Sequence, residues 1–193
     1  MAETMQLYHV GYSEIREPDI HYGRKNADFG QGFYLTADKA FGERWAKEKR
    51  GEMPRMNYYE LHTEGLKIRR FERDDDWFSY IYDNRHGKAD VLPEYDVIIG
   101  PIANDTIYDV LGITTSGYLE REQALRLLMI GPVYHQITIK TEKAAAQLTF
   151  LTSEEISREK TASMKEILQK EQEDFQKLFA KTMLEIMGED EAC

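Results

Sequence analysis

The chain has 193 residues, 41% hydrophobic and 31% charged, and its 25 basic and 35 acidic residues give a net charge of −10. It has no apolar run long enough to cross a membrane, no basic and then apolar leader at its start, and one cysteine, Cys193, so we expect a cytoplasmic protein without disulfides or a thiolate zinc site. The acidity also argues against avid, sequence-independent binding of nucleic acid, which requires a basic face.

The first part of the chain is predicted to hold two strands, a long loop and a helix. The strands are expected over residues 5–10 and 32–36. The stretch between them contains three glycines and a proline but no regular period, and long loops inside compact domains are usually functional. Apolar residues within 37–50 recur at helical spacing, which predicts a helix there.

The middle of the chain is predicted to mix strands and short helices. Strands over 57–63 and 66–71 are expected to form a hairpin that turns at Glu64-Gly65. Further strands are predicted over 95–100, 135–141 and 148–151, and further helices over 74–87, 104–111, 116–130 and 142–147. Because these elements follow no regular βαβ order, the pattern favours an α+β fold over a doubly wound one.

The last part of the chain differs from the rest in its charge and its periodicity. Residues 153–193 contain 11 acidic and 6 basic residues, so a fifth of the chain carries half of the net charge. Within them, residues 153–187 have the spacing of one long amphipathic helix. We therefore divide the chain into a domain, 1–152, and a helical extension, 153–193. The helix either packs on its own domain or docks a partner or a second copy.

The candidate catalytic and binding residues lie mainly between Leu7 and Ala46. The chain has no P-loop, no dinucleotide-binding glycine fingerprint, no nucleophile elbow and no H-E-x-x-H motif. Its five histidines lack metal-ligand spacing, so we expect no metal site. What remains is a histidine at the end of the first strand, His9, and the run Phe29-Gly30-Gln31-Gly32-Phe33-Tyr34 at the start of the second.

These two motifs resemble the front half of an ADP-ribosyltransferase domain of the His-Tyr-Glu type, the group that includes the poly-ADP-ribose polymerases and diphtheria toxin. In that family a strand ends in His-Gly-Ser/Thr, and a loop leads to Phe-Gly-x-Gly-x-Tyr. The run Tyr22–Gly30 more narrowly resembles an uncharacterised bacterial branch that is associated with toxin–antitoxin pairs. The resemblance covers roughly residues 5–150, including 95–105 and 135–144, and implies a split β-sheet sandwich with peripheral helices.

The resemblance also implies a substrate and a role for individual residues. The substrate is NAD, whose nicotinamide–ribose bond breaks through an oxocarbenium-like state. His9 would bond the adenosine ribose, Tyr34 would stack on the nicotinamide ring, and Arg24 would contact the pyrophosphate. The residues assigned to NAD in this way are His9, Val10, Gly11, Arg24, Asp28, Phe29, Gly30, Gly32, Tyr34 and Thr36.

The sequence departs from the family pattern at two places. The glycine that follows the histidine is Val10 here, with Gly11 one position later. The catalytic glutamate, which would offset the developing positive charge, is replaced by Gln136. Either the site is active, with Gln136 for orientation and Glu142 or Asp28 as the acid, or the domain binds a nucleotide without transferring it.

The resulting expectation is an NAD-dependent mono-ADP-ribosyltransferase-like protein with His9, Tyr34 and Gln136 as its central residues. It would modify a macromolecule, protein or nucleic acid, with Tyr134 and His135 near the target. It could be the toxin of a toxin–antitoxin pair, with a small antitoxin or a second copy bound through 153–187. The alternatives are a non-catalytic module that binds NAD or ADP-ribose, or an interaction protein on the same fold.

Overall fold

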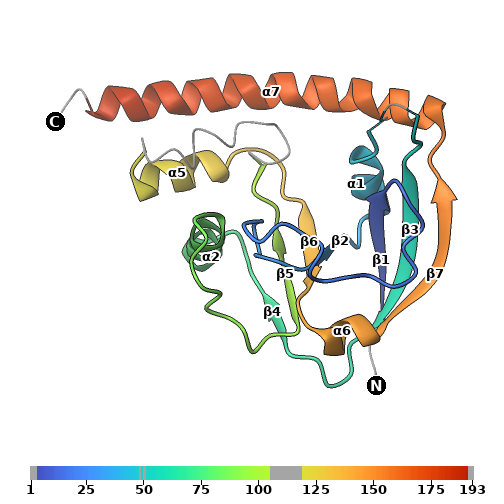
Figure 1. The fold of residues 1–193 in the computed structure, drawn as a ribbon. Coiled ribbons are helices and arrows are strands. Elements are labelled where there is room, and N and C mark those ends of the chain that lie inside the picture. Colours follow the sequence, from blue (N-terminus) through green and yellow to red (C-terminus); the bar gives the residue numbers. More distant parts are fainter. Residues whose placement is uncertain (1–3, 48, 50, 105–118, 191–193) are drawn as a thin grey trace.

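In the computed structural model, which describes residues 4–47, 49, 51–104 and 119–190, the strands form two small sheets (Figure 1). One sheet has the order β1-β3-β7 and is antiparallel throughout; the other has the order β2-β6-β5-β4, with β4 and β5 parallel. The strands are β1 (Thr4–Gly11), β2 (Phe33–Leu35), β3 (Arg55–His62), β4 (Ile68–Arg70), β5 (Val97–Pro101), β6 (His135–Ile139) and β7 (Leu148–Glu155). The prediction of an α+β fold is confirmed.

Five helices lie around the sheets within the described ranges. They are α1 (Lys39–Arg44), α2 (Asp75–Arg85), α5 (Arg121–Leu128), α6 (Glu142–Ala146) and α7 (Arg158–Asp190). Side-chain oxygens cap the first turns of α1 and α2. Asp38 accepts from the Phe41 amide at 3.1 Å, and Asp74 accepts from the Trp77 amide at 3.0 Å. None of the described helices has both the length and the apolar character needed to span a membrane.

The main core lies between the two sheets. Alternation along β5 explains how it forms, because Val97 and Ile99 join the core between the sheets while Ile98 faces the opposite way. On that other face, Ile98 packs with aromatic residues of α2, Trp77 and Phe78 among them, and with α5. The second sheet is therefore buried on both faces. The first sheet packs against the main core on one face, and on its other face a small cluster that contains Ala46, Met56 and Ile156 covers part of it.

The two sheets are joined where β1 meets the end of β2. Tyr8 and Thr36 form an isolated antiparallel bridge, with the Tyr8 amide donating to Thr36 at 2.8 Å and the Thr36 amide donating to Tyr8 at 3.0 Å. Thr36 stands one residue beyond β2, and β2 pairs with β6. The predicted site residues on β1, β2 and β6 are thereby brought to one place.

The predicted hairpin is wrong. Although both strands exist, β3 lies in the first sheet and β4 in the second, where Ile68 pairs with Val97. A turn at Gly65, whose φ is +72°, sends the chain from one sheet to the other. Asp96 then fixes β4 beside β5, since its carboxylate accepts from the Lys67 amide at 2.8 Å. Alternating hydrophobicity identifies strands but does not select their partners.

Other boundaries also shift. The helix predicted over 37–50 ends at Arg44, because Trp45 and Ala46 make shorter-range bonds to Gly42 and Glu43. The last strand does not end at residue 151 but runs to Glu155, across the division placed after residue 152. Of the helices predicted over 104–111 and 116–130, residues 105–118 lie outside the described part of the chain.

The long terminal helix packs on its own domain. Along α7, Phe175, Phe179 and Ile186 are buried against Leu127 and Ile130 of α5 and the segment that follows it. Figure 1 shows α7 lying along α5 at one end and reaching α1 at the other. Of the two interpretations of the amphipathic pattern, packing in cis is the one that the structure bears out for this face.

Candidate functional site

The site begins at His9, at the end of β1. Its Nδ1 donates to the backbone oxygen of Tyr34 at 2.8 Å, and its ring stacks on Phe33 with 4.6 Å between centroids. Burial lowers the pKa of His9, so the neutral ring is favoured. With Nδ1 protonated by this bond, Nε2 carries the lone pair and is an acceptor, suited to a ligand hydroxyl.

Tyr34, on β2, is held by the loop that precedes it. Residues 19–32 are called the glycine loop below. The Tyr34 hydroxyl donates to the Gly30 oxygen at 2.6 Å and accepts from the Phe29 amide at 3.0 Å. Burial, and then the charge of Asp28, raise the pKa of Tyr34 well above its ordinary value. The hydroxyl therefore stays protonated and anchors the loop, which leaves the ring as the part that can meet a ligand.

Two glycines allow this loop to close onto the sheet. Gly30 has φ +71°, a conformation that side chains with a Cβ rarely adopt. A Cβ on Gly32 would lie 2.6 Å from both the Ile139 oxygen and Cγ2 of Thr138. In this structure the close approach that Gly32 permits is to β6 of the protein itself.

Gln136 and Asp28 belong to one buried network. Gln136, 4% exposed, donates through Nε2 to Oδ2 of Asp28 at 3.3 Å. Oδ1 of Asp28 accepts from Nη2 and Nε of Arg85 at 2.7 and 2.9 Å, and Oδ2 also accepts from the Ala103 amide at 3.2 Å. The two side chains of the Arg85–Asp28 ion pair are 5% and 8% exposed. Protein groups thus occupy both oxygens of Asp28.

Glu142, the other acid considered as a substitute, lies in the wrong place. It begins α6, after the far end of β6, whereas Gln136 is at the start of that strand. At about 3.3 Å per residue, the strand separates the two by roughly 15 Å or more. Glu142 instead pairs with His21 at 3.4 Å, with its side chain 78% exposed. It therefore cannot act at the atoms that Gln136 meets.

The remaining predicted contacts divide into buried and exposed residues. Thr36 is 1% exposed, and its hydroxyl donates to the His135 oxygen at 3.1 Å, which ties β2 to β6. Val10 packs against a small cluster that contains Met56 and Ile156. Gly11 adjoins His9, and a Cβ there would lie 3.3 Å from Nε2. Arg24 is exposed on the glycine loop.

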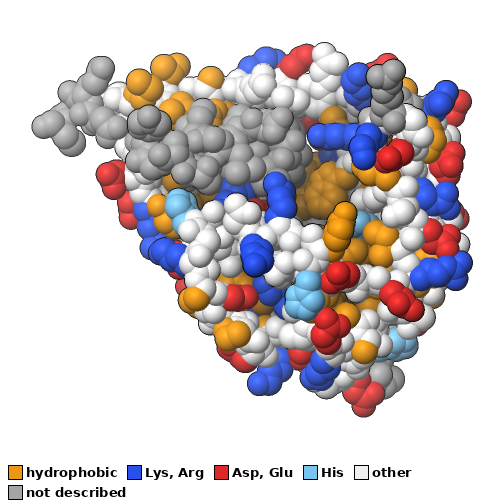
Figure 2. Space-filling model, in the orientation of Figure 1, with side chains coloured by type: hydrophobic (Ala, Val, Ile, Leu, Met, Phe, Trp, Pro, Cys, Tyr) orange, Lys and Arg blue, Asp and Glu red, His pale blue; other side chains and the backbone are white. Residues whose placement is uncertain are grey.

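Next to Gln136, an aromatic pair joins β6 to α1. The rings of Tyr134 and Phe41 stack with centroids 4.3 Å apart and an angle of 14° between planes. Arg44 donates to the Tyr134 hydroxyl and to Glu171 of α7, the latter at 2.8 Å. His135 is exposed beside this pair. Figure 2 shows hydrophobic side chains within a hollow beside α1.

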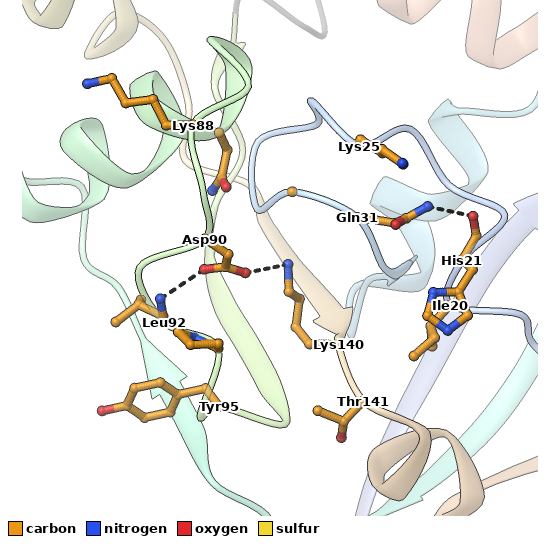
Figure 3. A pocket seen from close by; sticks show the side chains of 13 residues that line it. Ile20, His21, Lys25, Gln31, Lys88, Asp90, Leu92, Tyr95, Lys140 and Thr141 are labelled. Atoms are coloured by element: carbon orange, nitrogen blue, oxygen red, sulfur yellow. Dashed lines mark hydrogen bonds and ion pairs between the residues drawn. The ribbon is translucent and has the colours of Figure 1, made fainter.

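A separate pocket of about 430 Å³ lies on another side of the glycine loop. Figure 3 shows the Lys140 and Asp90 side chains pointing toward each other inside it. The Lys140 ammonium lies 3.1 Å from Asp90 and donates to the Phe29 oxygen at 2.5 Å. Burial opposes ionisation of Asp90, yet the Leu92 amide and Lys140 together lower its pKa. Lys140 thus braces the loop from the pocket side.

Sequence reasoning missed two buried amides that hold the chain between β1 and β2. Asn57, fully buried on β3, donates to the Ser13 oxygen at 3.0 Å and accepts from the Ile15 amide at 3.1 Å. Asn84 of α2 donates to the Asp28 backbone oxygen at 3.1 Å. A buried amide with no apolar periodicity to place it gives no signal in the sequence. Among the described residues, no group of three histidine, cysteine or acidic side chains could hold a metal ion.

Comparison with known proteins places this site inside one family. Residues 5–150 match the family described as "Protein of unknown function (DUF3990)". The matched segment includes the residues of the site described above except Ile156, in the cluster beside Val10, and Glu171 of α7. Neither the curated proteins nor the solved structures gave a match.

Proposed function

The chain belongs to the DUF3990 family, and from this starting point we propose that it is an NAD-dependent mono-ADP-ribosyltransferase-like protein that modifies a macromolecule. The observation that carries the proposal is the convergence of the strands that bear His9, Tyr34 and Gln136, since β1 bridges to the end of β2 and β2 pairs with β6 at the junction of the two sheets. The order of the motifs along the chain supports it too. The split sheet sandwich of such transferases is part of the same proposal.

The geometry supports a distinct task for each of the three residues. Nε2 of His9 is the acceptor for a ribose hydroxyl, because Nδ1 is committed to the Tyr34 backbone. The Tyr34 ring supplies an aromatic face for the nicotinamide, whose positive charge favours such contact by about 0.5–2 kcal/mol. Gln136 supplies an amide beside the reacting ribose. Arg24 is the proposed contact for the pyrophosphate.

A second candidate function has its own support. Gln136 carries no charge, and the Asp28 carboxylate nearest to it is paired with Arg85. A site without an available carboxylate gives little electrostatic stabilisation to an oxocarbenium ion. These contacts favour a module that binds NAD or ADP-ribose without turnover.

Incubation with NAD labelled in its adenylate phosphate, together with cell extract, tests the transferase. Transfer of label to macromolecules and release of nicotinamide are expected, and both should be lost in His9→Ala. His62→Ala is the matched control, since His62 is half-exposed on β3 and pairs with Glu60 away from the site. Binding of NAD by calorimetry without label transfer or nicotinamide release would favour the binding module. No binding at all would refute both.

The proposal also includes two kinds of partner, a macromolecular target and an antitoxin or second copy of the chain. The target would approach Tyr134 and His135, beside Gln136. If the protein is the toxin of a toxin–antitoxin pair, an antitoxin or a second copy has to use the outer side of α7, because the inner face is packed against α5. Leu184 and Met187, 71% and 57% exposed, lie on that helix.

A further inference from the structure

The Asp28 carboxylate can only accept hydrogen bonds, and this restricts Gln136. A glutamine amide has a donating end and an accepting end of almost the same shape, so its orientation depends on its neighbours. Because the neighbour is a carboxylate oxygen at 3.3 Å, the nitrogen must face Asp28. The carbonyl oxygen, Oε1, is then the end that remains for a ligand.

Arg85 and Asn84 make this arrangement rigid. Two charge-assisted bonds of 2.7 and 2.9 Å hold one oxygen of Asp28, and the Asn84 amide holds its backbone. The pair is buried, so water does not compete for the carboxylate. The orientation of Gln136 is therefore set by the loop and α2, and not by β6 alone.

The same loop segment also holds Tyr34. Phe29 and Gly30, which directly follow Asp28, make both bonds to the Tyr34 hydroxyl. The three consecutive residues 28–30 thus position two side chains of the proposed site, those of Tyr34 and Gln136. A displacement of this segment would move the aromatic face and the amide together.

We infer that Asp28 is a positioning residue, which turns the Gln136 amide so that Oε1 faces a ligand as a hydrogen-bond acceptor. The ligand group at this point is then a donor, a sugar hydroxyl and not a phosphate or carboxylate. The inference rests on the proposed function for the identity of that ligand, NAD. Asp28 is not itself the acid of the site, because protein groups occupy both of its oxygens.

An exchange of the two side chains tests this inference in the full-length chain. Asp28→Asn removes the obligatory acceptor, and Gln136→Glu places a second carboxylate against Asp28. We expect each single variant to bind NAD about tenfold or more weakly in calorimetry. The double variant again pairs one amide with one carboxylate and presents an acceptor oxygen to the ligand. It should recover to within about threefold of the original affinity.

Asp96→Asn is the matched control, because Asp96 is also a buried carboxylate on the same sheet but is bonded to Lys67, Thr141 and Lys143. It should lower the free energy of unfolding and leave NAD affinity unchanged. If Asp28→Asn folds and binds NAD like the original chain, or if the double variant binds no better than the singles, the inference is wrong. If Asp28→Asn does not fold, Gln136→Met replaces it. That variant keeps the Arg85–Asp28 pair but has no amide, and unchanged NAD affinity would likewise overturn the inference.

A readout without NAD separates this inference from the proposed function. In nuclear magnetic resonance spectra, the Gln136 side-chain amide protons should exchange slowly with water in the original chain and rapidly in Asp28→Asn, but not in Asp96→Asn. Slow exchange together with a failure to bind NAD would refute the proposed function while the positioning role stands. Rapid exchange in the original chain would refute the positioning role, whatever binds.

Discussion

The glycine loop and α7 are attached to the same domain with a different balance of polar and apolar contacts. Besides its buried Ile20 and Phe29 side chains, the loop is held by polar groups, namely the Arg85–Asp28 pair, the Tyr34 hydroxyl and Lys140. The helix is held mainly by apolar side chains, with Phe175, Phe179 and Ile186 buried against α5. Apolar packing tolerates changes of shape if volume is kept, whereas hydrogen bonds and ion pairs fix atoms in direction and distance. The difference locates the part of the molecule where geometry matters most.

The largest effect is expected at the buried ion pair. Arg85→Met leaves the Asp28 carboxylate buried without its partner, which typically costs about 3–5 kcal/mol. The free energy of unfolding, measured with urea at pH 7, should fall by that amount. Arg69→Met is the control, since Arg69 makes a surface pair with Asp76 at 3.5 Å and lies over the Phe71 ring at 4.7 Å, and the variant should lose less than about 2 kcal/mol. Equal losses in the two variants would show that the buried Arg85–Asp28 pair holds the loop no more strongly than a surface pair would.

A large-to-small change in the apolar region should be nearly as costly but have a different consequence. Phe179, 7% exposed, lies in the cluster between α5 and α7. Phe179→Ala should lower the free energy of unfolding by about 3 kcal/mol through lost burial and a cavity. Amide hydrogen exchange should increase along α7 and stay unchanged in the glycine loop. Leu184→Ala, at a position 71% exposed, should change neither quantity. Faster exchange in the loop of Phe179→Ala would show that the two regions are coupled.

The same contrast explains what the sequence could predict. The periodic spacing of α7 and the alternation of β1, β5 and β6 made those elements predictable, because burial of an apolar face determines them. The motifs also placed His9 and Tyr34 on two successive strands, and in the structure the His9 ring donates to the Tyr34 backbone oxygen. In contrast, nothing in the spacing of Asp28, Arg85 and Gln136 indicates that they meet, since they come from a loop, a helix end and a strand. Polar contacts between distant segments have no period in the sequence.

A smaller effect is expected at the other side of the loop. Lys140→Met removes the bonds to Asp90 and the Phe29 oxygen, and should cost about 1–2 kcal/mol. Because the loop loses a brace, trypsin should cleave faster after Arg24 and Lys25, which are exposed there. Lys143→Met is matched, since Lys143 also bonds a carboxylate, Asp96, and a backbone oxygen, Gly65. It should lose stability without faster cleavage in the loop. Equal cleavage of the two variants would show that Lys140 does not brace the loop.

The smallest effect concerns the proton of His9. Since burial lowers its pKa in the folded chain, the unfolded chain binds more protons as the pH falls below about 6.5, the ordinary value for histidine. The contribution of His9 to stability is therefore complete above that pH and is lost progressively as the pH falls toward the lower folded value. Urea unfolding at pH 7.5 and 5.5 should show a smaller loss of stability on acidification in His9→Gln than in the original chain. An unchanged pH dependence in His9→Gln would mean that the ring is solvated at the junction of the two sheets, and that the polar region around the glycine loop ends before it reaches β1.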